Sequence, residues 1–291
     1  MSIYSELQKL YPSFKIPTEK FTNYYLYQLL EAGICEQKHL DQMANLFDKE
    51  KDISKYKMKS MDKILKYFEE QDWKLSEIDM TPYLSDYQEK EFNDYKEHNF
   101  YISLDLKQAN WQAFQTAFSL KLPEFSNWVK NEFKIHPFIA ESKSWRQLLF
   151  GNTNPKKIQI ISKFLMQKIY LNLPLQLSEK CVGKRSDELI FEFTSRPSAE
   201  IISSLSKLSI QLDLQTSLNL FQMKNEFSFS ENVKIKYSLS LVDEEIILNK
   251  KMCGVSGNRY FIHLKNLILN TTIKDEDLYF ENQGYLAKWV L

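Results

Sequence analysis

The stretch Phe100-Tyr-Ile-Ser-Leu-Asp-Leu-Lys-Gln-Ala-Asn110 decides the fold that this sequence predicts. Residues 99–106 form a compact run of apolar and β-forming side chains, which is typical of a strand. The helical spacing of Trp111 and Phe114 then predicts a helix to about residue 120. Asp105 therefore lies at the end of a predicted strand, just before a predicted helix.

A second acidic position lies in the segment Lys184-Arg-Ser-Asp-Glu-Leu-Ile-Phe-Glu-Phe193. Residues 180–184 and 189–193 are strand-like, and the polar residues between them, including Asp187 and Glu188, predict the turn of a β-hairpin. A single Asp after a strand is most often an N-cap or turn residue, and an Asp-Glu pair between strands is most often an exposed turn. The acidic positions therefore indicate a site only in combination.

Between these positions lies Trp145-Arg-Gln-Leu-Leu-Phe-Gly-Asn-Thr-Asn-Pro-Lys-Lys157, inside a window of 37 residues (142–178) that contains no Asp or Glu. Pro155 suits the first turn of a helix to about Tyr170. Positive charge here would hold a triphosphate or a nucleic-acid backbone. An amphipathic helix with a basic polar face explains the same pattern equally well. The basic residues of the window are Lys143, Arg146, Lys156, Lys157, Lys163 and Lys168.

The rest of the chain divides into a helical part and a strand-rich part. Residues 21–32 and 53–71 show helical spacing, and the second stretch is rich in lysine, as expected for a solvated face or for a helix along a phosphate backbone. Ser198 is a good N-cap for a helix to about residue 209. Strands are predicted at 217–223, 233–242, 245–249 and 260–267, with a turn at 242–245 and a final strand or docking segment from residue 277.

Composition limits the class of protein. The formal net charge is zero, with 38 basic and 38 acidic residues, so a nucleic-acid partner would need a local basic surface. The three cysteines are far apart, which favours a reducing intracellular compartment, cytoplasmic or nuclear. The four histidines show no zinc-site spacing. No apolar run approaches the ~20 residues of a membrane span, so we expect no membrane partner.

Asp105, Asp187 and Glu188 are the candidate catalytic residues. Phosphoryl transfer with two metal ions needs carboxylates that converge on ions roughly 3.5–4 Å apart. Mg²⁺ prefers hard oxygen ligands and keeps several waters, so two or three carboxylates suffice. A strand-end aspartate and a hairpin aspartate meet this need only if the fold pairs their strands. We therefore expect Asp105 and Asp187 to lie close together and to bind Mg²⁺ or Mn²⁺.

In this order, the three segments resemble motifs A, B and C of palm-type nucleotide polymerases, and their layout is most similar to a reduced family A DNA polymerase. That family has a strand-borne metal aspartate, a fingers helix with arginine and lysine, and a His-Asp-Glu hairpin. Here Ser186 stands in the place of the hairpin histidine, and Leu-Lys-Gln-Ala-Asn follows Asp105 where the family has Tyr-Ser-Gln-Ile-Glu. The segments also resemble uncharacterised viral and phage proteins.

The resemblance implies a role for each matching residue. Asp105 and Asp187 would bind the metal ions, and Glu188 would orient a primer end or serve as a secondary ligand. The implied partners are nucleic acid and a nucleoside triphosphate, whose phosphates and sugar would be contacted by basic and polar side chains. These candidate substrate- and phosphate-binding residues are Lys107, Asn110, Arg146, Lys156, Lys157, Lys184 and Arg185.

The sequence and the resemblance together predict an α+β fold in three parts. Residues 1–95 would form a helical, thumb-like region. Residues 96–213 would form a palm-like core, with a mixed or antiparallel sheet, helices on one face and a short basic fingers-like insertion at about 123–175. Residues 214–291 would form a β-rich C-terminal region.

The predicted function is Mg²⁺-dependent transfer of nucleotides onto a nucleic-acid end. Three other functions are compatible with the same residues. The protein could be a non-catalytic nucleic-acid-binding subunit with a palm-like fold, or a viral structural or assembly protein that uses its C-terminal strands. A metal-dependent nuclease is the third alternative, because the same carboxylates could activate water.

Overall fold

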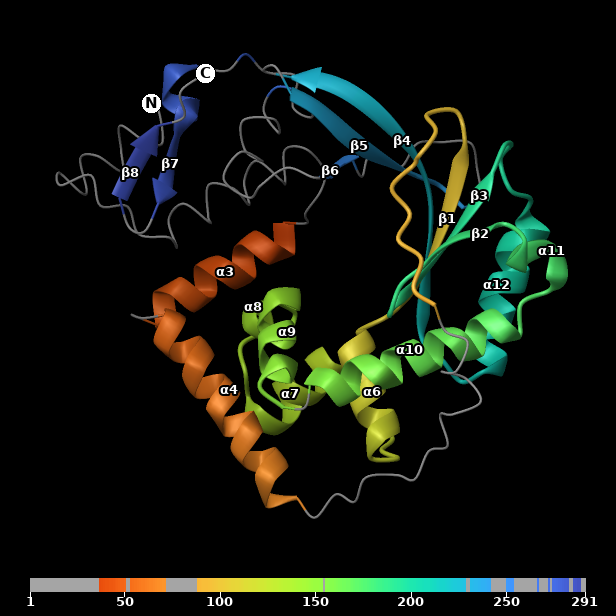
Figure 1. The fold of residues 1–291 in the computed structure, drawn as a ribbon. Helices are drawn as coiled ribbons and strands as arrows, with labels where there is room; N and C mark the ends of the chain where they lie inside the picture. Colours follow the sequence, from red (N-terminus) through yellow and green to blue (C-terminus); the bar gives the residue numbers. More distant parts are fainter. Residues whose placement is uncertain are drawn as a thin grey trace. The chain divides into compact units, whose positions relative to one another are not determined.

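The computed structural model describes residues 37–50, 53–71, 88–153, 155–228, 231–241, 250–253, 266, 272, 274–282 and 285–288. The protein belongs to the α+β class (Figure 1). It divides into two compact units, and the larger one comprises residues 50–221 and 240–244. All the candidate site residues lie in this larger unit.

Most of the helices that the structure describes lie in the larger unit. In chain order its elements are α4 (Ile53–Glu70), β1 (Phe100–Leu106), α6 (Ala109–Ala117), α7 (Phe125–Phe133), α8 (Pro137–Ala140), α9 (Lys143–Gly151), α10 (Pro155–Leu171), α11 (Leu175–Ser178), β2 (Cys181–Lys184), β3 (Glu188–Phe193) and α12 (Ala199–Gln211). Strand β4 (Thr216–Ser228) begins in this unit and continues into the second.

The second unit contains helix α3 (Gln37–Lys49), strands β5 (Glu231–Leu239) and β6 (Lys250–Cys253), and the short 3₁₀ helix η2 (Asp275–Leu278). A two-stranded hairpin of β7 (Tyr279–Asn282) and β8 (Tyr285–Lys288) follows. Across the described parts of both units, no helix combines the length and the apolar character needed to cross a membrane.

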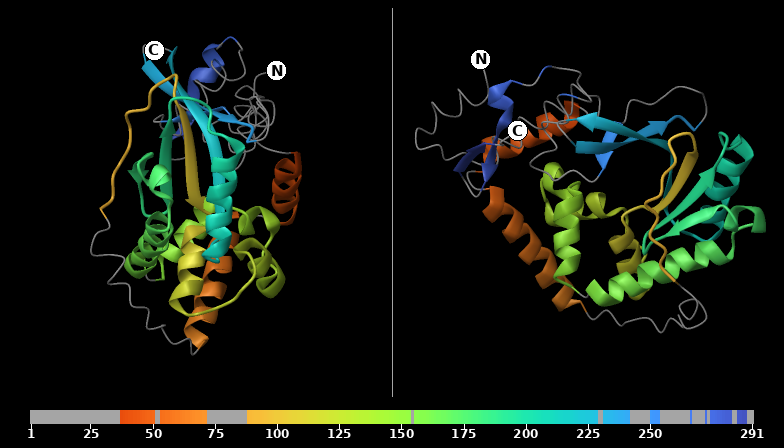
Figure 2. Two further views of the ribbon diagram at one scale, coloured as in Figure 1. Left: turned by 90° about the vertical axis from the view of Figure 1, so that its right-hand side faces the viewer. Right: turned by 45° about the horizontal axis from the view of Figure 1, so that its top comes forward.

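The main sheet has the strand order β2-β3-β1-β4-β5-β6. Strand β1 pairs antiparallel with both β3 and β4, and β2 pairs antiparallel with β3. Helices α6 to α11 connect β1 to β2, and α12, in teal beside the strands in Figure 2, connects β3 to β4. Strands β1 to β4 with these helices therefore form a split β-α-β-β-α-β unit, in which the end of β1 adjoins the β2–β3 hairpin.

The central strand β1 has one apolar face and one polar face, because alternate side chains point to opposite sides of a sheet. Leu104 and Leu106 lie on the apolar face and are buried. Ser103 and Asp105 lie on the polar face, where Glu188 of β3 is directly opposite Asp105. Acidic side chains of two neighbouring strands therefore share one face of the sheet.

An aromatic cluster holds helix α6 in place. Trp111 of α6 stacks on Trp128 of α7, with ring centroids 5.0 Å apart. Phe125 and Phe150 contact Trp111 from α7 and α9, and Phe68 of α4 stacks on Trp128. Full burial of one such side chain contributes about 1.5–3 kcal/mol to stability. The cluster therefore fixes the helix that begins directly after the end of β1.

The lysine-rich helix α4 packs against the same helices. Its Lys57 carbonyl accepts a hydrogen bond of 3.2 Å from the Trp145 indole. The Lys63 ammonium donates to the Phe133 carbonyl at 3.0 Å. At least one lysine of this helix therefore serves packing within the unit.

Most elements predicted for the larger unit are confirmed. Helices α4, α6, α10 and α12 and strands β1 to β3 form where the sequence predicts them, and the Ser198 side chain caps α12. Glu188 is the first residue of β3 rather than part of the turn, because its backbone continues the pairing with Asp105. The basic segment from Trp145 to Lys157 spans two helices, α9 and α10.

In the C-terminal part, β4 runs to Ser228, beyond its predicted end at residue 223, and β5 ends at Leu239. The predicted tail strand corresponds to the β7–β8 hairpin. The predicted helix at 21–32, the turn at 242–245 and the strand at 245–249 lie outside the described residues. So does the predicted strand at 260–267, apart from residue 266.

Candidate functional site

The end of β1 and the β2–β3 hairpin meet at the candidate site. Asp105 pairs with Glu188 across the β1–β3 ladder, and the Leu106 N–H donates to the Asp187 carbonyl at 2.9 Å. Residues opposite each other in an antiparallel pair have Cβ atoms about 4.5–5.5 Å apart. The segments that carry Asp105 and Asp187 are therefore adjacent, and both side chains line one cleft.

This cleft has a volume of about 460 Å³. The end of β1, the first turn of α6, the N-terminal end of α7, helix α9, the hairpin and the start of β4 surround it. It contains equal numbers of acidic and basic side chains. The acidic ones are Asp105, Glu124 and Asp187, and the basic ones are Lys107, Lys143 and Arg146.

Asp187 is held in an environment that disfavours its charge. Burial, followed by the negative charge of Glu188, raises the pKa of Asp187 above its ordinary value, while the charges of Lys143 and Arg185 act in the opposite direction. A carboxylate in such an environment gains free energy when an additional cation is placed against it.

Glu188 is engaged within the hairpin and does not line the cleft. Its carboxylate accepts a hydrogen bond from the Ser103 hydroxyl on β1. It also pairs with the Arg185 guanidinium at 3.2 Å, and the Arg185 N–H donates to the Glu188 carbonyl at 2.8 Å. Glu188 and Arg185 therefore fix the hairpin that presents Asp187.

Helix α9 brings two cations to the cleft. Lys143 is the first residue of α9, after the N-cap Ser142, and its charge acts on Asp187. Arg146 follows one turn later and is half-buried. Burial lowers the pKa of Arg146, and the nearby charge of Glu124 partly offsets this. A partly desolvated guanidinium is well suited to bind an anion, because less water has to be displaced.

Amide side chains build the frame of the cleft. Gln108 has a left-handed backbone with φ of 52°, and its amide donates to Glu124 at 2.7 Å and accepts from the Phe125 N–H at 3.1 Å. The buried Gln112 amide donates to the Lys107 and Gln215 carbonyls at 2.6 Å each. These bonds tie the end of β1 to α7 and to the start of β4. The left-handed backbone of Gln108 is a form of local strain, and such strain is often found at functional sites.

Four of the predicted phosphate-binding residues do not line this cleft. Lys156 is exposed in the first turn of α10. Lys157 lines a separate apolar cavity next to α4 and α6. The Lys184 ammonium lies 4.2 Å from the centre of the Tyr170 ring, and Arg185 pairs with Glu188. Lys107, Asn110 and Arg146 do line the cleft with Asp105 and Asp187.

The residues suited to a metal ion are two carboxylates, Asp105 and Asp187, with the Ser217 hydroxyl in the same lining. No group of three or more Asp, Glu, His or Cys side chains with metal-binding geometry occurs among the described residues. Mg²⁺ is commonly bound by one or two carboxylates together with water and substrate phosphates. The donors present therefore fit a Mg²⁺ or Mn²⁺ ion that binds together with a phosphate-bearing substrate.

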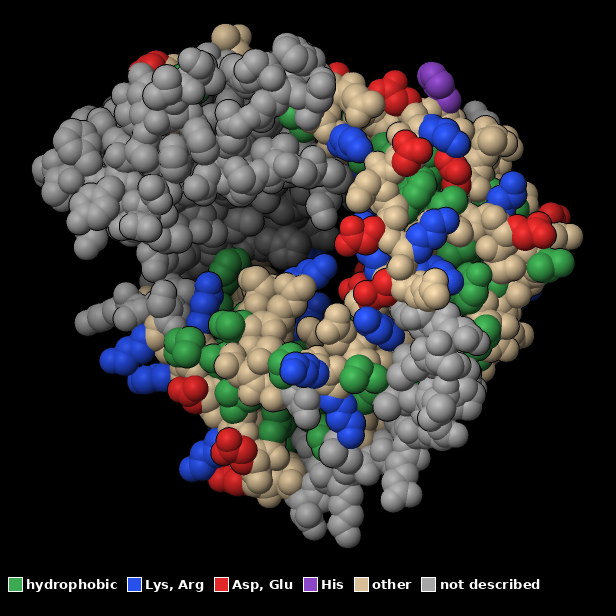
Figure 3. Space-filling view, viewed as in Figure 1, with side chains coloured by type: hydrophobic (Ala, Val, Ile, Leu, Met, Phe, Trp, Pro, Cys, Tyr) green, Lys and Arg blue, Asp and Glu red, His purple; other side chains and the backbone are tan. Residues whose placement is uncertain are grey.

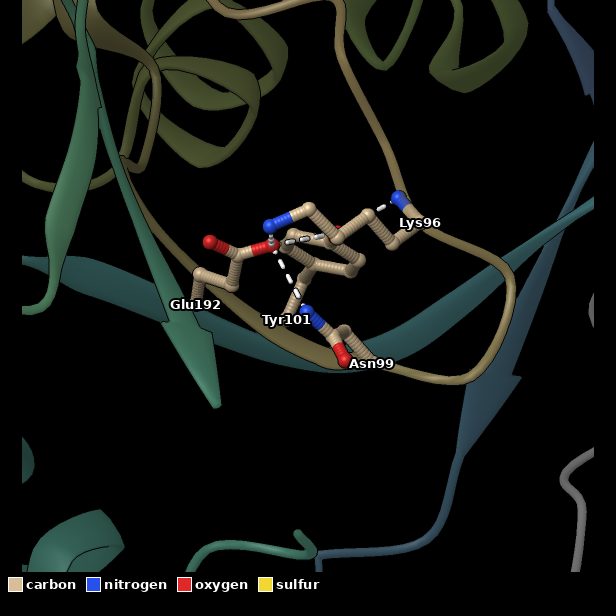
Figure 4. A network of polar contacts seen from close by, with 4 residues as sticks. All are labelled: Lys96, Asn99, Tyr101 and Glu192. Carbon is tan, nitrogen blue, oxygen red and sulfur yellow. Dashed lines mark hydrogen bonds and ion pairs between the residues drawn. The ribbon is translucent and has the colours of Figure 1, made fainter. Parts of the chain in front are cut away.

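At the other end of the polar face, a network of hydrogen bonds secures residues 88–99 to the sheet (Figure 4). Glu192 of β3 accepts hydrogen bonds from the Asn99 amide at 2.8 Å and from the Tyr101 hydroxyl at 3.0 Å. Burial, with a further contribution from Glu192, raises the pKa of Tyr101 to about 12, so its hydroxyl remains a donor. The Tyr101 oxygen accepts from the Lys96 N–H at 2.8 Å.

Several lining residues were not selected from the sequence as site residues. Lys143 belongs to the acid-free window, and its place directly after the N-cap Ser142 is a signal that it starts a helix. Glu124 follows Pro123 and is the N-cap residue of α7, without a capping hydrogen bond from its side chain. Gln215 and Ser217 carry no such signal, because only the β1–β4 pairing brings them to Asp105.

Acidic and basic side chains are interspersed over the described residues on the face shown in Figure 3. Comparison with known proteins gave no match to this chain among protein family models, curated proteins or solved structures.

Proposed function

We propose that this protein is an intracellular, divalent-metal-dependent nucleotidyltransferase with a palm-like core. The β-α-β-β-α-β order supports the proposal, because palm domains carry one carboxylate at a strand end and another at the adjacent hairpin. The observation that carries it is that Asp105 and Asp187, from two separate segments, line one cleft with Lys107, Lys143 and Arg146.

The proposed roles follow from the position of each group. Asp105 and Asp187 hold the metal ion, which supplies a Lewis acid for the transferred phosphoryl group when bound. Arg146 and Lys143 bind the phosphates of a nucleoside triphosphate and stabilise the charge that develops on the leaving pyrophosphate. Lys107, which follows the end of β1, contacts a further phosphate.

The test is incorporation of labelled nucleotides onto DNA and RNA ends in the presence of Mg²⁺ or Mn²⁺. We expect Asp105→Asn and Asp187→Asn each to lower the incorporation rate by at least roughly 100-fold, because each removes charge stabilisation from the transition state. A chelator should abolish the activity of the unmodified protein.

Asp213→Asn is the matched control. Asp213 is exposed after α12, with a left-handed φ of 56° that asparagine also tolerates. This variant should retain full activity. If incorporation is unchanged in both Asp105→Asn and Asp187→Asn, these carboxylates are not catalytic and the proposal is wrong.

A non-catalytic subunit with the same fold is the second candidate. The observation that favours it is that Ser103 and Arg185 already engage Glu188, which leaves only two of the three predicted catalytic carboxylates, Asp105 and Asp187, in the cleft. This candidate predicts salt-dependent binding of nucleic acid without nucleotide turnover.

A further inference from the structure

A second, smaller cavity adjoins the charged cleft. It has a volume of about 210 Å³ and shares Ala109, Asn110, Gln147 and Asp187 with the cleft. Its remaining walls come from α9, α10 and the hairpin. We refer to it as the side pocket. The four shared residues form a common boundary between the side pocket and the charged cleft.

The side pocket differs in chemistry from the cleft. No lysine or arginine lines it, and Asp187, on the shared boundary, is its single charged residue. Phe150, Pro155 and Ile158 supply apolar walls. Its other polar groups are neutral, namely the amides of Asn110, Gln147 and Gln159 and the hydroxyls of Ser162 and Ser186. This lining does not suit a phosphate, but it suits a flat, uncharged ring with hydrogen-bonding edges.

The amides of the side pocket are available for a ligand. Within the described part of the chain, no hydrogen bond engages the side-chain amides of Asn110, Gln147 and Gln159. Gln108 and Gln112 of the neighbouring cleft, by contrast, use their amides to hold the backbone in place. Two kinds of amide therefore occur side by side, one kind structural and the other unengaged.

Asparagine and glutamine amides pair with the edges of nucleobases, since each offers a donor and an acceptor in one plane. Proteins that bind an unpaired base combine such hydrogen bonds with apolar walls on the two ring faces. The side pocket combines amide groups with apolar wall residues and lies next to a cleft that carries three basic side chains.

We propose that the side pocket binds the base of the nucleotide whose phosphates lie in the charged cleft, and that Asn110, Gln147 and Gln159 read the edge of that base. This inference rests on the proposed nucleotide site. It adds that the protein itself discriminates between bases, so that selection of the nucleotide does not require a template strand. The substrate class is then a single nucleoside triphosphate with a preferred base.

The experiment measures binding without turnover and without nucleic acid. The probes are the four α,β-imido nucleoside triphosphates and inorganic tripolyphosphate, each with Mg²⁺, titrated calorimetrically against the full chain. We expect the nucleotide with the favoured base to bind at least roughly tenfold more tightly than the nucleotide with the least favoured base. One or two hydrogen bonds supply a difference in affinity of this size. Gln147→Leu and Gln159→Leu should each reduce this preference several-fold. Gln159 lies outside the charged cleft, so Gln159→Leu should leave tripolyphosphate affinity unchanged.

Gln211→Leu is the matched control, since Gln211 is an exposed glutamine at the end of α12, outside both cavities. This variant should keep the preference of the unmodified protein. Equal affinities for all four nucleotides, or a preference that survives in Gln147→Leu and Gln159→Leu, would overturn the inference and leave the nucleotide site intact. If neither tripolyphosphate nor any nucleotide binds, the proposed function itself is wrong, and the inference with it.

Discussion

Glu192 shows how single residues stabilise the polar face of the sheet. Partial burial acts to raise its pKa, but hydrogen bonds from Asn99 and Tyr101 and the charge of Lys96 outweigh burial and hold the pKa of Glu192 below its ordinary value. A depressed pKa means that the folded protein binds a proton here less readily than the unfolded chain. The stabilisation is therefore complete above the unfolded pKa of about 4.3 and is lost as the pH falls through the folded pKa.

Replacement of Glu192 by Gln should thus destabilise the protein at neutral pH and matter less in acid. We expect a loss of about 1 kcal/mol in the free energy of unfolding at pH 7, because hydrogen bonds to a charged acceptor are replaced by neutral ones. Urea denaturation at pH 7 and at pH 3.5 measures the difference. Glu179→Gln, in an exposed residue outside the network, is the control. A deficit of equal size at both pH values would contradict the assignment.

At the scale of elements, residues 88–99 cover part of the sheet and depend on one glycine of β2. The Lys90 and Lys184 backbones exchange two hydrogen bonds of 2.8 and 2.9 Å. A Cβ placed on Gly183 would lie 3.0 Å from the Phe92 Cβ and 3.3 Å from Ile190 atoms. The segment can approach β2 this closely only because Gly183 has no side chain.

Gly183→Ala should therefore destabilise the protein by about 1–3 kcal/mol, the usual cost of overpacking a close contact. The measurement is the midpoint of chemical denaturation, with Gly151→Ala as the control. A Cβ on Gly151 would meet no atom within 4 Å, and alanine favours the helix that contains it. Equal or greater stability of Gly183→Ala would mean that the segment can move away from β2 at little cost.

The elements were largely predictable from the sequence, and the site only in part. Strand β1 and helix α10 follow from local patterns. The two aspartates are predictable because Asp105 lies near the end of one strand and Asp187 directly precedes another. The engagement of Glu188 by Arg185 depends on the register of the hairpin, which composition does not specify. The sequence predicts that Lys157 binds phosphate, but Lys157 lines an apolar cavity, because packing sets the rotation of α10 about its axis.

For the whole molecule, ligand binding should be visible as a gain in stability. A ligand that binds only the folded state at 100 times its Kd adds about 2.7 kcal/mol to the free energy of unfolding. For a chain of this size, that gain raises Tm by roughly 4 °C. We expect Mg²⁺ with tripolyphosphate to produce such a shift in the unmodified protein.

The same measurement on Asp105→Asn provides the contrast. Loss of a metal-binding carboxylate should reduce the shift strongly, while Asp213→Asn should keep it in full. Identical shifts in all three proteins would place the ligand elsewhere on the chain.

The equal numbers of acidic and basic side chains in the charged cleft have a consequence for the order in which ligands arrive. A locally neutral site exerts little long-range pull on an isolated cation or on an isolated polyanion. Each ligand alone leaves one set of charges uncompensated, whereas both together satisfy the two sets. Metal ion and polyphosphate should therefore strengthen each other's binding, and the preformed metal chelate of the nucleotide is the species that we expect the cleft to capture.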